Sequence, residues 1–373
     1  MMNRGLKIAI LELYYGQSGK LGFYNSQSLG LAKAFVKMGH EVFIVRPEKG
    51  RRQMHKQKLG EKITLLTLPA RTLGVHSFYN LSFLKEYKID LVHLNADNQA
   101  FVPYIIKFCK RNHICLYNYV GTIHSDSDNK IKRLALEWFS KRNIQSFKKS
   151  TTFVKTEAVY QELKRKNVSN AQIVPVGLDF EVIPEITESK MAIREKLKLP
   201  SDKKILLYIG RMSEYKKPLD AVEILNNMDE EYYLVAIGDG ELKKAFLEKV
   251  DRFNLDNQVK HIPSVPNLEI HDYYRAADCF LNFNPKEIFG MSILESLYQE
   301  CPVVARHAPG PDMIIQNGEM GYLCDTIDEM CECLSKINSS MGKKGKERVK
   351  DRFSWSAASK TFLEKAGFCE EQE

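Results

Sequence analysis

The stretch "LKIAILEL" (residues 6–13) decides the fold because it begins a unit in which strands alternate with helices. It is a short apolar run, which predicts a buried strand. The stretch "SLGLAKAFVKMG" (28–39) then places apolar residues at helical spacing and ends at Gly39, a residue typical of a helix C-cap. "HEVFIV" (40–45) predicts the next strand. A strand–helix–strand unit of this kind indicates a parallel sheet that helices cover on both faces.

The alternation continues along the chain and restarts after a charged stretch near residue 185. Further apolar runs predict strands at 91–95, 114–120, 205–210, 232–238, 279–283 and 302–306. A chain of 373 residues is also too long for one ordinary hydrophobic core. We therefore expect an α/β fold of two doubly wound, Rossmann-like domains that face each other across a cleft. The expected domains are residues 1–184 and 185–355, followed by a C-terminal helix (356–373) that crosses back to the first domain.

Composition is that of a globular, cytoplasmic protein. Hydrophobic residues make up 44% of the chain and charged residues 27%. No apolar run approaches the roughly 18 residues that a membrane span needs. The first 13 residues do not have the pattern of a signal peptide, and the eight cysteines lack zinc-finger spacing. We expect reduced thiols and a cytoplasmic location.

The two halves of the chain differ strongly in charge. Residues 1–184 carry 29 Lys/Arg and 14 Asp/Glu, a net charge of +15, whereas residues 185–373 carry 26 and 33, a net charge of −7. A basic half joined to an acidic half indicates that one half faces an anionic partner. Nucleic acid, an anionic membrane surface and a phosphorylated substrate all fit this pattern.

Residues that can bind a ligand follow four predicted strands of the second half. "YIGRMSEYKK" (208–217), "AIGDGE" (236–241), "NPKEIFGMSILE" (284–295) and "HAPGPDMIIQNG" (307–318) each carry glycine, cations or acids. A turn that needs glycine explains any one of them. Four together favour a binding site, because ligands of doubly wound sheets bind beyond the carboxyl ends of the strands.

The third of these segments holds two carboxylates eight positions apart, Glu287 and Glu295, on either side of Gly290. A helix that starts at this glycine offers its first amides to an anion. A carboxylate accepts hydrogen bonds from two neighbouring hydroxyls, and Arg211 and Lys216 can hold phosphate oxygens. This set fits a nucleotide diphosphate sugar. The alternative is a surface glutamate within the helix and a helix-terminal charge stabilised by the dipole.

At this segment the chain resembles the retaining glycosyltransferases of family four, which have the GT-B fold. "EIFGMSILE" (287–295) is similar to their E-x7-E signature. The resemblance extends over most of the chain. It includes "GLAKAFVKMGHEV" (30–42), "VPVGLD" (174–179), "YIGRMSEYKK" (208–217), "IGDGEL" (237–242) and "APGPDMIIQNGEMGYL" (308–323).

The resemblance implies a role for individual residues. Catalytic roles fall on His124, Arg211, Lys216 and Glu287. Donor binding falls on Gly22, Gly210, Gly238, Val265, Phe289, Gly290, Met291, Ser292 and Glu295. The chain departs from the family pattern at Phe23, where a second glycine is usual, and at Lys217, Ser264 and Asp312.

The resemblance also implies the chemistry. The acceptor hydroxyl would attack on the face that the leaving diphosphate vacates, and a phosphate oxygen would take the proton. No cofactor and no essential divalent metal are then expected, because cations and a helix terminus offset the charge of the diphosphate. The acids of "DSD" (126–128) are interpreted as part of a solvated loop.

Two basic segments in the first half of the chain bear on which anionic partner this half faces. Residues 129–150 mix seven Lys/Arg with Leu134, Trp138 and other apolar residues, and residues 49–58 form a second basic cluster. Basic amphipathic segments lie on anionic lipid. An ordinary helix with a solvated charged side explains residues 129–150 equally. With the resemblance, they favour a glycan or lipid-linked acceptor and a peripheral position on the inner face of the membrane. The expected pathway is the assembly of a bacterial surface polysaccharide or glycolipid.

Three other functions compete with this hypothesis. A nucleotide-sugar epimerase of the same architecture would act on the donor alone. A non-catalytic protein that binds nucleotides or sugars would use the same site without turnover. A nucleic-acid-binding protein would explain the basic half, but the chain carries no known nucleic-acid motif, so we expect no nucleic-acid partner.

Overall fold

The computed structural model describes residues 5–14, 27–124 and 130–368, and the side chains of residues 134 onward in the last range. The chain forms two compact units. Unit 1 comprises Met1–Asp179 together with Trp355–Glu373, and unit 2 comprises Phe180–Ser354. Asp179 Oδ2 accepts a hydrogen bond of 2.7 Å from Lys33 Nζ of the same unit. The division falls before residue 184, the boundary expected from the sequence.

Unit 1 is built on one mainly parallel sheet. Its strands are β1 (Lys7–Leu11), β2 (Glu41–Lys49), β3 (His55–Lys58), β4 (Ile63–Leu73), β5 (His76–Tyr79), β6 (Leu91–Asn95), β7 (Cys115–Val120), β8 (Thr151–Val154) and β9 (Ala171–Ile173). The order across the sheet is β3-β4-β2-β1-β6-β7-β8-β9, with β5 also paired to β4. The pairings of β3 and β5 with β4 are antiparallel, and the other neighbours are parallel.

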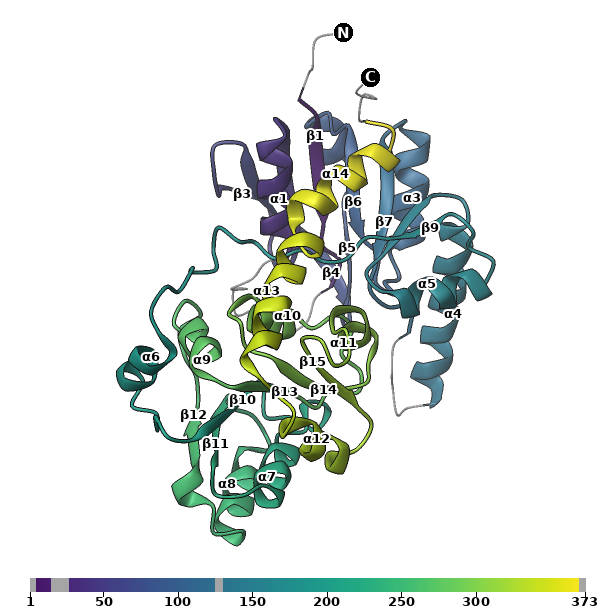
Figure 1. Ribbon diagram of the computed structural model, residues 1–373. Coiled ribbons are helices and arrows are strands. Elements are labelled where there is room, and N and C mark those ends of the chain that lie inside the picture. The colour runs from purple at the N-terminus through teal and green to yellow at the C-terminus, as the bar shows by residue number, and fades with distance from the viewer. Residues whose placement is uncertain (1–4, 15–26, 125–129, 369–373) are drawn as a thin grey trace. The chain divides into compact units, whose positions relative to one another are not determined.

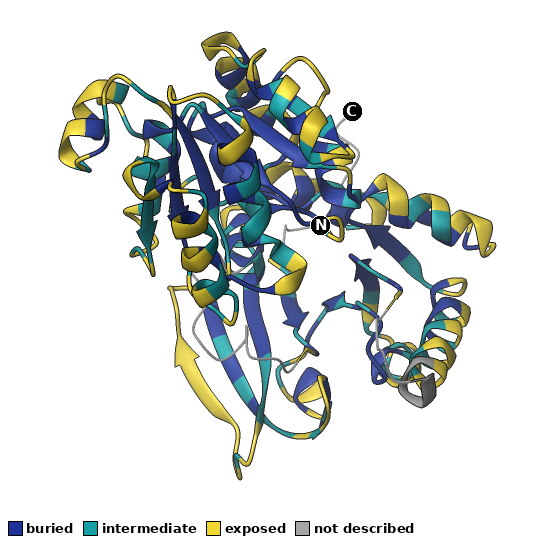
Figure 2. Cartoon of the chain, turned by 90° about the horizontal axis from the view of Figure 1, so that it is seen from below, coloured by how far each residue is buried: buried dark blue, intermediate teal, exposed yellow. Residues whose placement is uncertain are grey.

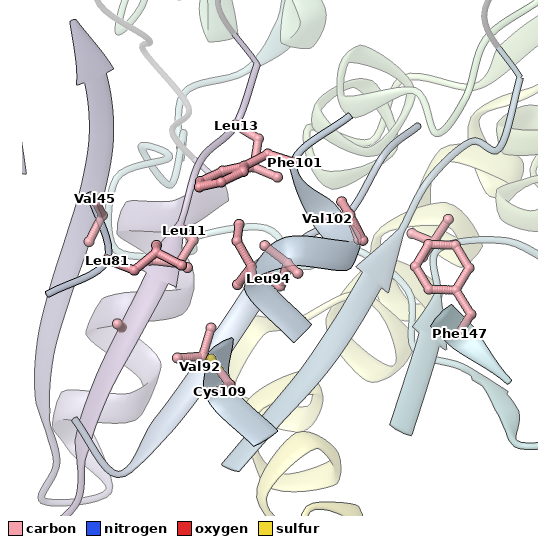
Figure 3. Packing of buried hydrophobic residues seen from close by; sticks show 14 of the residues in the cluster. Leu11, Leu13, Val45, Leu81, Val92, Leu94, Phe101, Val102, Cys109 and Phe147 are labelled. Carbon is pink, nitrogen blue, oxygen red and sulfur yellow. The ribbon is translucent and has the colours of Figure 1, made fainter. Parts of the chain in front are cut away.

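Apolar strands and amphipathic helices form the core of unit 1. Its helices are α1 (Gln27–Lys37), α2 (Phe83–Glu86), α3 (Val102–Arg111), α4 (Lys130–Phe147), α5 (Glu157–Arg165) and α14 (Trp355–Lys365). Figure 3 shows side chains of β1 and β6, among them Leu11, Val92 and Leu94, close to Val102 and Cys109 of α3. Each such side chain contributes about 1.5–3 kcal/mol when it is fully buried.

Helix α14 closes unit 1 although it lies far from the other elements in sequence (Figure 1). It packs against α1, where Gly30 permits close approach because a Cβ there would lie 2.5 Å from the Trp355 ring. Phe362 of α14 stacks on Tyr117 with ring centroids 4.9 Å apart and lies edge-on to Phe153 at 5.0 Å. The core of this unit is thus complete only with residues from beyond unit 2.

Unit 2 contains an entirely parallel sheet. Its strands are β10 (Lys204–Ile209), β11 (Tyr232–Ile237), β12 (Val259–Ile262), β13 (Cys279–Asn282), β14 (Val303–Arg306) and β15 (Gly321–Cys324). Their order is β12-β11-β10-β13-β14-β15. Counted within the unit this is 3-2-1-4-5-6, the order of a dinucleotide-binding Rossmann fold, in which the direction of progress reverses between β10 and β13.

Helices cover this sheet and leave most of its strands buried, whereas the edge strand β12 is only half-buried. They are α6 (Lys190–Lys196), α7 (Pro218–Asn227), α8 (Lys243–Arg252), α9 (Ile270–Ala276), α10 (Met291–Tyr298), α11 (Pro309–Ile314), α12 (Ile327–Leu334) and α13 (Ser339–Arg352). Short 3-10 helices span Glu214–Lys216 and Asp256–Gln258. Figure 2 shows buried strands in dark blue and helices with exposed outer faces in yellow. Among the residues that the structure describes, no helix has both the length and the apolar character that a membrane crossing requires.

A partly buried ion cluster attaches α6 to the unit 2 sheet. Asp278 accepts hydrogen bonds from Lys190 Nζ at 2.9 Å, Arg194 Nη2 at 2.5 Å and the Ile205 amide at 2.7 Å. Burial raises the pKa of Asp278, but Lys190, the Ile205 amide and Arg194 outweigh it, so the net pKa lies below its ordinary value. The carboxylate stays ionised and holds the buried Arg194 in place.

Candidate active site

Most of the predicted site residues of unit 2 follow the carboxyl ends of β10 and β13. These strands are neighbours, and the strand order reverses between them. A crevice outside such a reversal is where open α/β sheets bind ligands. Arg211 and Lys216 follow β10, while Glu287 and Gly290 follow β13.

The loop after β10 is fixed by a buried tyrosine. The hydroxyl of Tyr208 lies 3.3 Å from the carbonyl oxygen of Arg211 and 3.5 Å from that of Lys216. Lys217 ends the 3-10 helix in the left-handed conformation, with φ 49°, just before Pro218 opens α7. A left-handed φ is the physical reason why glycine suits this position. Arg211 is exposed and forms no ion pair with any side chain of the described ranges.

Glu287 and Lys216 form the central ion pair of the site. Lys216 Nζ lies 2.7 Å from Glu287 Oε2, and both side chains are largely buried, with 25% and 16% exposed. Asn284 Nδ2 donates a second hydrogen bond of 3.0 Å to the same oxygen. The amide of Gly310, at the start of α11, binds the carbonyl oxygen of Glu287 at 3.0 Å. Lys216 and Asn284 therefore hold this carboxylate in one orientation, and the start of α11 holds its backbone.

Gly290 opens helix α10 towards the site. It adopts φ 97° and ψ 65°, a left-handed conformation that glycine takes without cost. Its carbonyl accepts from the amides of Ile293 and Leu294, so the helical hydrogen bonds begin there. The first amides of the helix, those of Met291 and Ser292, have no partner further back in the helix and can bind an anion. Phe289, which precedes them, is buried.

Glu295 lies inside α10 with only 7% of its surface exposed. The hydroxyl of Tyr274, on α9, donates to its Oε2 at 3.4 Å. A carboxylate in such a place is not a solvated helix residue, since burying a charge requires hydrogen-bonding partners. The structure therefore turns neither glutamate of the segment towards bulk water.

Two predicted glycines are explained by packing between loops. A Cβ on Gly238, at the end of β11, would lie 1.9 Å from the carbonyl oxygen of Gly210. A Cβ on Gly240 would lie 2.4 Å from that of Met212. These glycines let the β11 loop rest on the loop that carries Arg211. Val265 is half-buried in the connection between β12 and α9, a separate strand end of the same sheet.

Two of the predicted residues belong to unit 1. Gly22 lies outside the described residues, as do the acids at 126 and 128. His124 follows β7 and is exposed, and its Nε2 lies 2.6 Å from Glu162 Oε1 on α5. The structure thus joins Lys216 to Glu287 within unit 2, with Arg211 on the loop of Lys216 and Gly290 and Glu295 on the segment that follows Glu287.

Several residues of the site were missed by sequence reasoning. Asn284 and Tyr208 fix the ion pair and the cationic loop, and both stand within segments that the sequence had already selected. In unit 1, Asp97 accepts from the amides of Gly121 and Thr122 and from Lys155 Nζ at 3.3 Å. It thereby holds the loop that ends at His124. Nothing in the sequence near Asp97 marks this contact, because it joins two different strand ends.

The arrangement in unit 2 suits a ligand that carries both phosphate and hydroxyl groups. It offers a free guanidinium, a paired ammonium, helix-terminal amides and two held carboxylates. Within the described parts of the chain, no group of three or more His, Cys, Asp or Glu residues could hold a metal ion.

Comparison with known proteins shows what the chain is similar to. Residues 189–348, nearly all of unit 2, match the family described as "Glycosyl transferases group 1". Alpha-monoglucosyldiacylglycerol synthase from Acholeplasma laidlawii is 22% identical over 335 residues, which cover 84% of this chain and 83% of that protein.

Solved structures show the same fold. Sucrose-phosphate synthase from Thermosynechococcus elongatus superposes with a TM-score of 0.73 at 16% identity, covering 96% of this chain and 98% of that one. HepE from Anabaena, in complex with UDP, superposes with a TM-score of 0.72 at 13% identity, covering 98% and 100%. The expected fold class is confirmed as GT-B, with two Rossmann-like units. The resemblance is confirmed as well, since residues 189–348 match the group 1 glycosyltransferase model.

Proposed function

We propose that the chain transfers a sugar from a nucleotide diphosphate sugar to an acceptor hydroxyl, with retention of the anomeric configuration. The observation that carries this proposal is the Lys216–Glu287 pair at the strand reversal of unit 2, beside the amino terminus of α10. The pair places a cation for phosphate and an anion for hydroxyls within 2.7 Å of each other. A sugar bonded directly to a diphosphate presents these two kinds of group side by side.

Each residue of the site then has a defined task. Arg211 and Lys216 bind the diphosphate and offset the charge that grows on it as the sugar leaves. Glu287 accepts hydrogen bonds from hydroxyls of the transferred sugar, and the buried Glu295 accepts from those of the ribose. The amides between Phe289 and Ser292 bind sugar or phosphate oxygens. Gly210, Gly238 and Val265 shape the surface on which the nucleotide lies.

The reaction needs no protein base. The acceptor oxygen bonds to the anomeric carbon on the face that the diphosphate leaves, the carbon–oxygen bond to the phosphate breaks, and a phosphate oxygen takes the acceptor proton. Positive charge on the sugar ring is stabilised by the diphosphate itself, as in glycoside chemistry generally. A contact of His124 with the donor sugar is part of the proposal. We propose that no divalent metal is required; loss of activity in EDTA with recovery in manganese would contradict this.

A lipid-borne acceptor and a peripheral membrane position extend the proposal. The named relative from Acholeplasma laidlawii is a glycolipid synthase. On α4, Leu134 and Trp138 are 66% and 57% exposed and lie four residues apart, on one face of the helix. The guanidinium of Arg142 lies 5.2 Å from the Trp138 ring, so a cation lies beside this apolar pair. Such a helix face suits an anionic membrane surface on the cytoplasmic side.

Vesicle sedimentation tests the membrane position. Binding should increase with the fraction of anionic lipid and fall several-fold for Trp138→Ala. The matched control is Met191→Ala, since Met191 is 70% exposed in unit 2. Binding that does not change with the fraction of anionic lipid would exclude this role for α4. An equal loss of binding in both variants would exclude it as well.

A screen of nucleotide sugars by thermal unfolding tests the donor. A donor at about 100 times its dissociation constant should stabilise the fold by roughly 2.7 kcal/mol. Lys216→Ala should abolish the shift, while Lys244→Ala should keep it, because Lys244 pairs with Glu248 on the exposed surface of the same unit. NMR of the product then reports the anomeric configuration, and inversion would refute the retaining mechanism.

The epimerase and the non-catalytic binder give other outcomes in the same experiments. An epimerase converts the donor without any acceptor. A binder gives the thermal shift but releases no nucleoside diphosphate. Release that depends on added acceptor supports transfer.

A further inference from the structure

Unit 1 contains a second pocket at the carboxyl ends of β2 and β4. It has a volume of about 480 Å³, within the usual range of ligand sites. Its lining comprises Arg51, Pro69, Ala70, Arg71, Phe78, Tyr79, Asn80, Phe101 and Tyr104. The pocket is thus at the sheet edge where parallel strands of this fold present ligand-binding groups, and none of its residues has a role in the donor site.

The charge of the pocket is entirely positive. Its lining includes two arginines and no acidic side chain. Arg71 is exposed and has no acidic partner among the described residues, whereas Arg51 uses its Nε to bind Glu48 at 2.7 Å. A guanidinium that is not neutralised selects a carboxylate or phosphate, which it can bind through two parallel hydrogen bonds.

The apolar part of the pocket is an exposed aromatic ring, Tyr104, that neighbouring aromatic rings hold in place. The ring of Tyr104 is stacked on Phe101 at 5.2 Å with an angle of 13°, yet 54% of Tyr104 is exposed. Phe101 is in turn held edge-on by Phe78 at 5.4 Å and by Tyr79 at 5.6 Å. An exposed ring held this firmly offers a flat face to the C–H groups of a sugar ring. The Oδ1 of Asn80 accepts from the Ser82 amide, which leaves its amide nitrogen for a sugar hydroxyl.

We infer that this pocket binds a sugar ring that carries a phosphate or a carboxylate. Tyr104 packs against the ring and Arg71 binds the anion. A neutral sugar lacks the group for Arg71, and a bare anion lacks the ring for Tyr104, so the pair recognises the two together. The inference rests on the proposed function only in taking this ligand as the acceptor; binding itself does not require catalysis.

Calorimetric titration of the full chain with four probes tests the inference. The probes are glucose 6-phosphate, glucuronic acid, glucose and inorganic phosphate. Wild type should bind both anionic sugars at least tenfold more tightly than glucose or phosphate. Arg71→Gln should remove that tenfold preference. Arg111→Gln, which makes the same change at an exposed site in the last turn of α3, should bind as wild type does.

The aromatic half is tested in the same way. Tyr104→Leu should weaken both anionic sugars five- to tenfold without changing phosphate binding, and Tyr104→Phe should retain wild-type affinity. Wild-type binding by both Arg71→Gln and Tyr104→Leu would overturn the inference. Inorganic phosphate that binds as tightly as glucose 6-phosphate would also overturn it, since the pocket would then recognise an ion alone.

Two further experiments are needed. One distinguishes a lipid headgroup from a free sugar as the ligand, and the other distinguishes failure of this inference from failure of the proposed function. Retention on phosphatidylinositol vesicles that both variants abolish assigns the ring-plus-anion chemistry to a lipid headgroup, whereas binding of the water-soluble sugars alone assigns it to a free sugar. Lys216→Ala should leave probe binding intact. Probe binding without any nucleotide-sugar turnover would refute the proposed function and leave this inference standing.

Discussion

Replacing Glu287 by glutamine should change nucleotide binding and turnover in opposite directions. In the free protein this carboxylate lies 2.7 Å from Lys216 Nζ and neutralises it. Glutamine keeps the size of the side chain and can still accept from Asn284, but it removes the negative charge. A free nucleoside diphosphate should therefore bind more tightly, while a nucleotide sugar should react more slowly.

The expected magnitudes follow from the geometry. A phosphate oxygen that accepts from Lys216 at about 2.8 Å would lie up to about 5.5 Å from the Glu287 carboxylate. At an effective dielectric of about 20, the repulsion is about 3 kcal/mol, or roughly 150-fold in affinity. Loss of charged hydrogen bonds to the sugar should lower kcat/KM by about 1.5–3 kcal/mol, a factor of roughly 10 to 150.

Calorimetry with the best nucleoside diphosphate and initial rates with its sugar would measure both effects. Glu248→Gln serves as the matched control, because it removes the same charge from an exposed pair in unit 2 and should change neither quantity more than twofold. Weaker binding of the nucleoside diphosphate by Glu287→Gln would show that the carboxylate does not oppose the phosphate. Our placement of the donor would then be wrong.

Three further predictions concern stability. Asp278→Asn should lower the free energy of unfolding by roughly 3 kcal/mol, because the buried Arg194 loses its counter-ion. Unfolding in urea measures this free energy. A decrease below about 1 kcal/mol would contradict the role given to Asp278. Burial lowers the pKa of His93 to about 3. Between pH 3 and about pH 6.5, His93 therefore binds a proton in the unfolded chain but not in the folded one. Unfolding free energy should therefore fall by about 1.4 kcal/mol per pH unit below 6.5, and His93→Gln should show a correspondingly smaller slope. Gly238→Ala should cost about 1–3 kcal/mol and weaken nucleotide binding, since its Cβ would overlap the Gly210 carbonyl; an unchanged melting temperature would refute this.

Much of the fold follows from local pattern. The apolar run before Arg211 and the helix after it correspond to β10 and α7, because buried parallel strands and amphipathic helices differ in period and length. Strand β3 could not be predicted in this way. All four of its residues are exposed, so its pairing with β4 leaves no apolar signal in the sequence.

In the candidate site, too, local features could be predicted from the sequence and long-range contacts could not. The positions of Glu287 and Glu295 relative to Gly290 are local, so their places before and inside α10 could be anticipated. The ion pair with Lys216 joins residues 71 positions apart and depends on β10 and β13 being neighbours. Strand order is decided by packing of whole elements, which no short segment records. The contact of Asp97 with the Gly121 loop was invisible for the same reason.

The return of α14 to unit 1 also affects how the chain folds during synthesis. Unit 2 is one continuous segment, so all of it has been translated before Trp355 leaves the ribosome. Domains generally fold as units in the order in which they emerge. Unit 1 begins the chain, but Tyr117 and Phe153 of its core stay uncovered until Phe362 has been synthesised. The later-encoded unit can thus reach its native state first, and the nascent first unit is the part that most needs protection from aggregation.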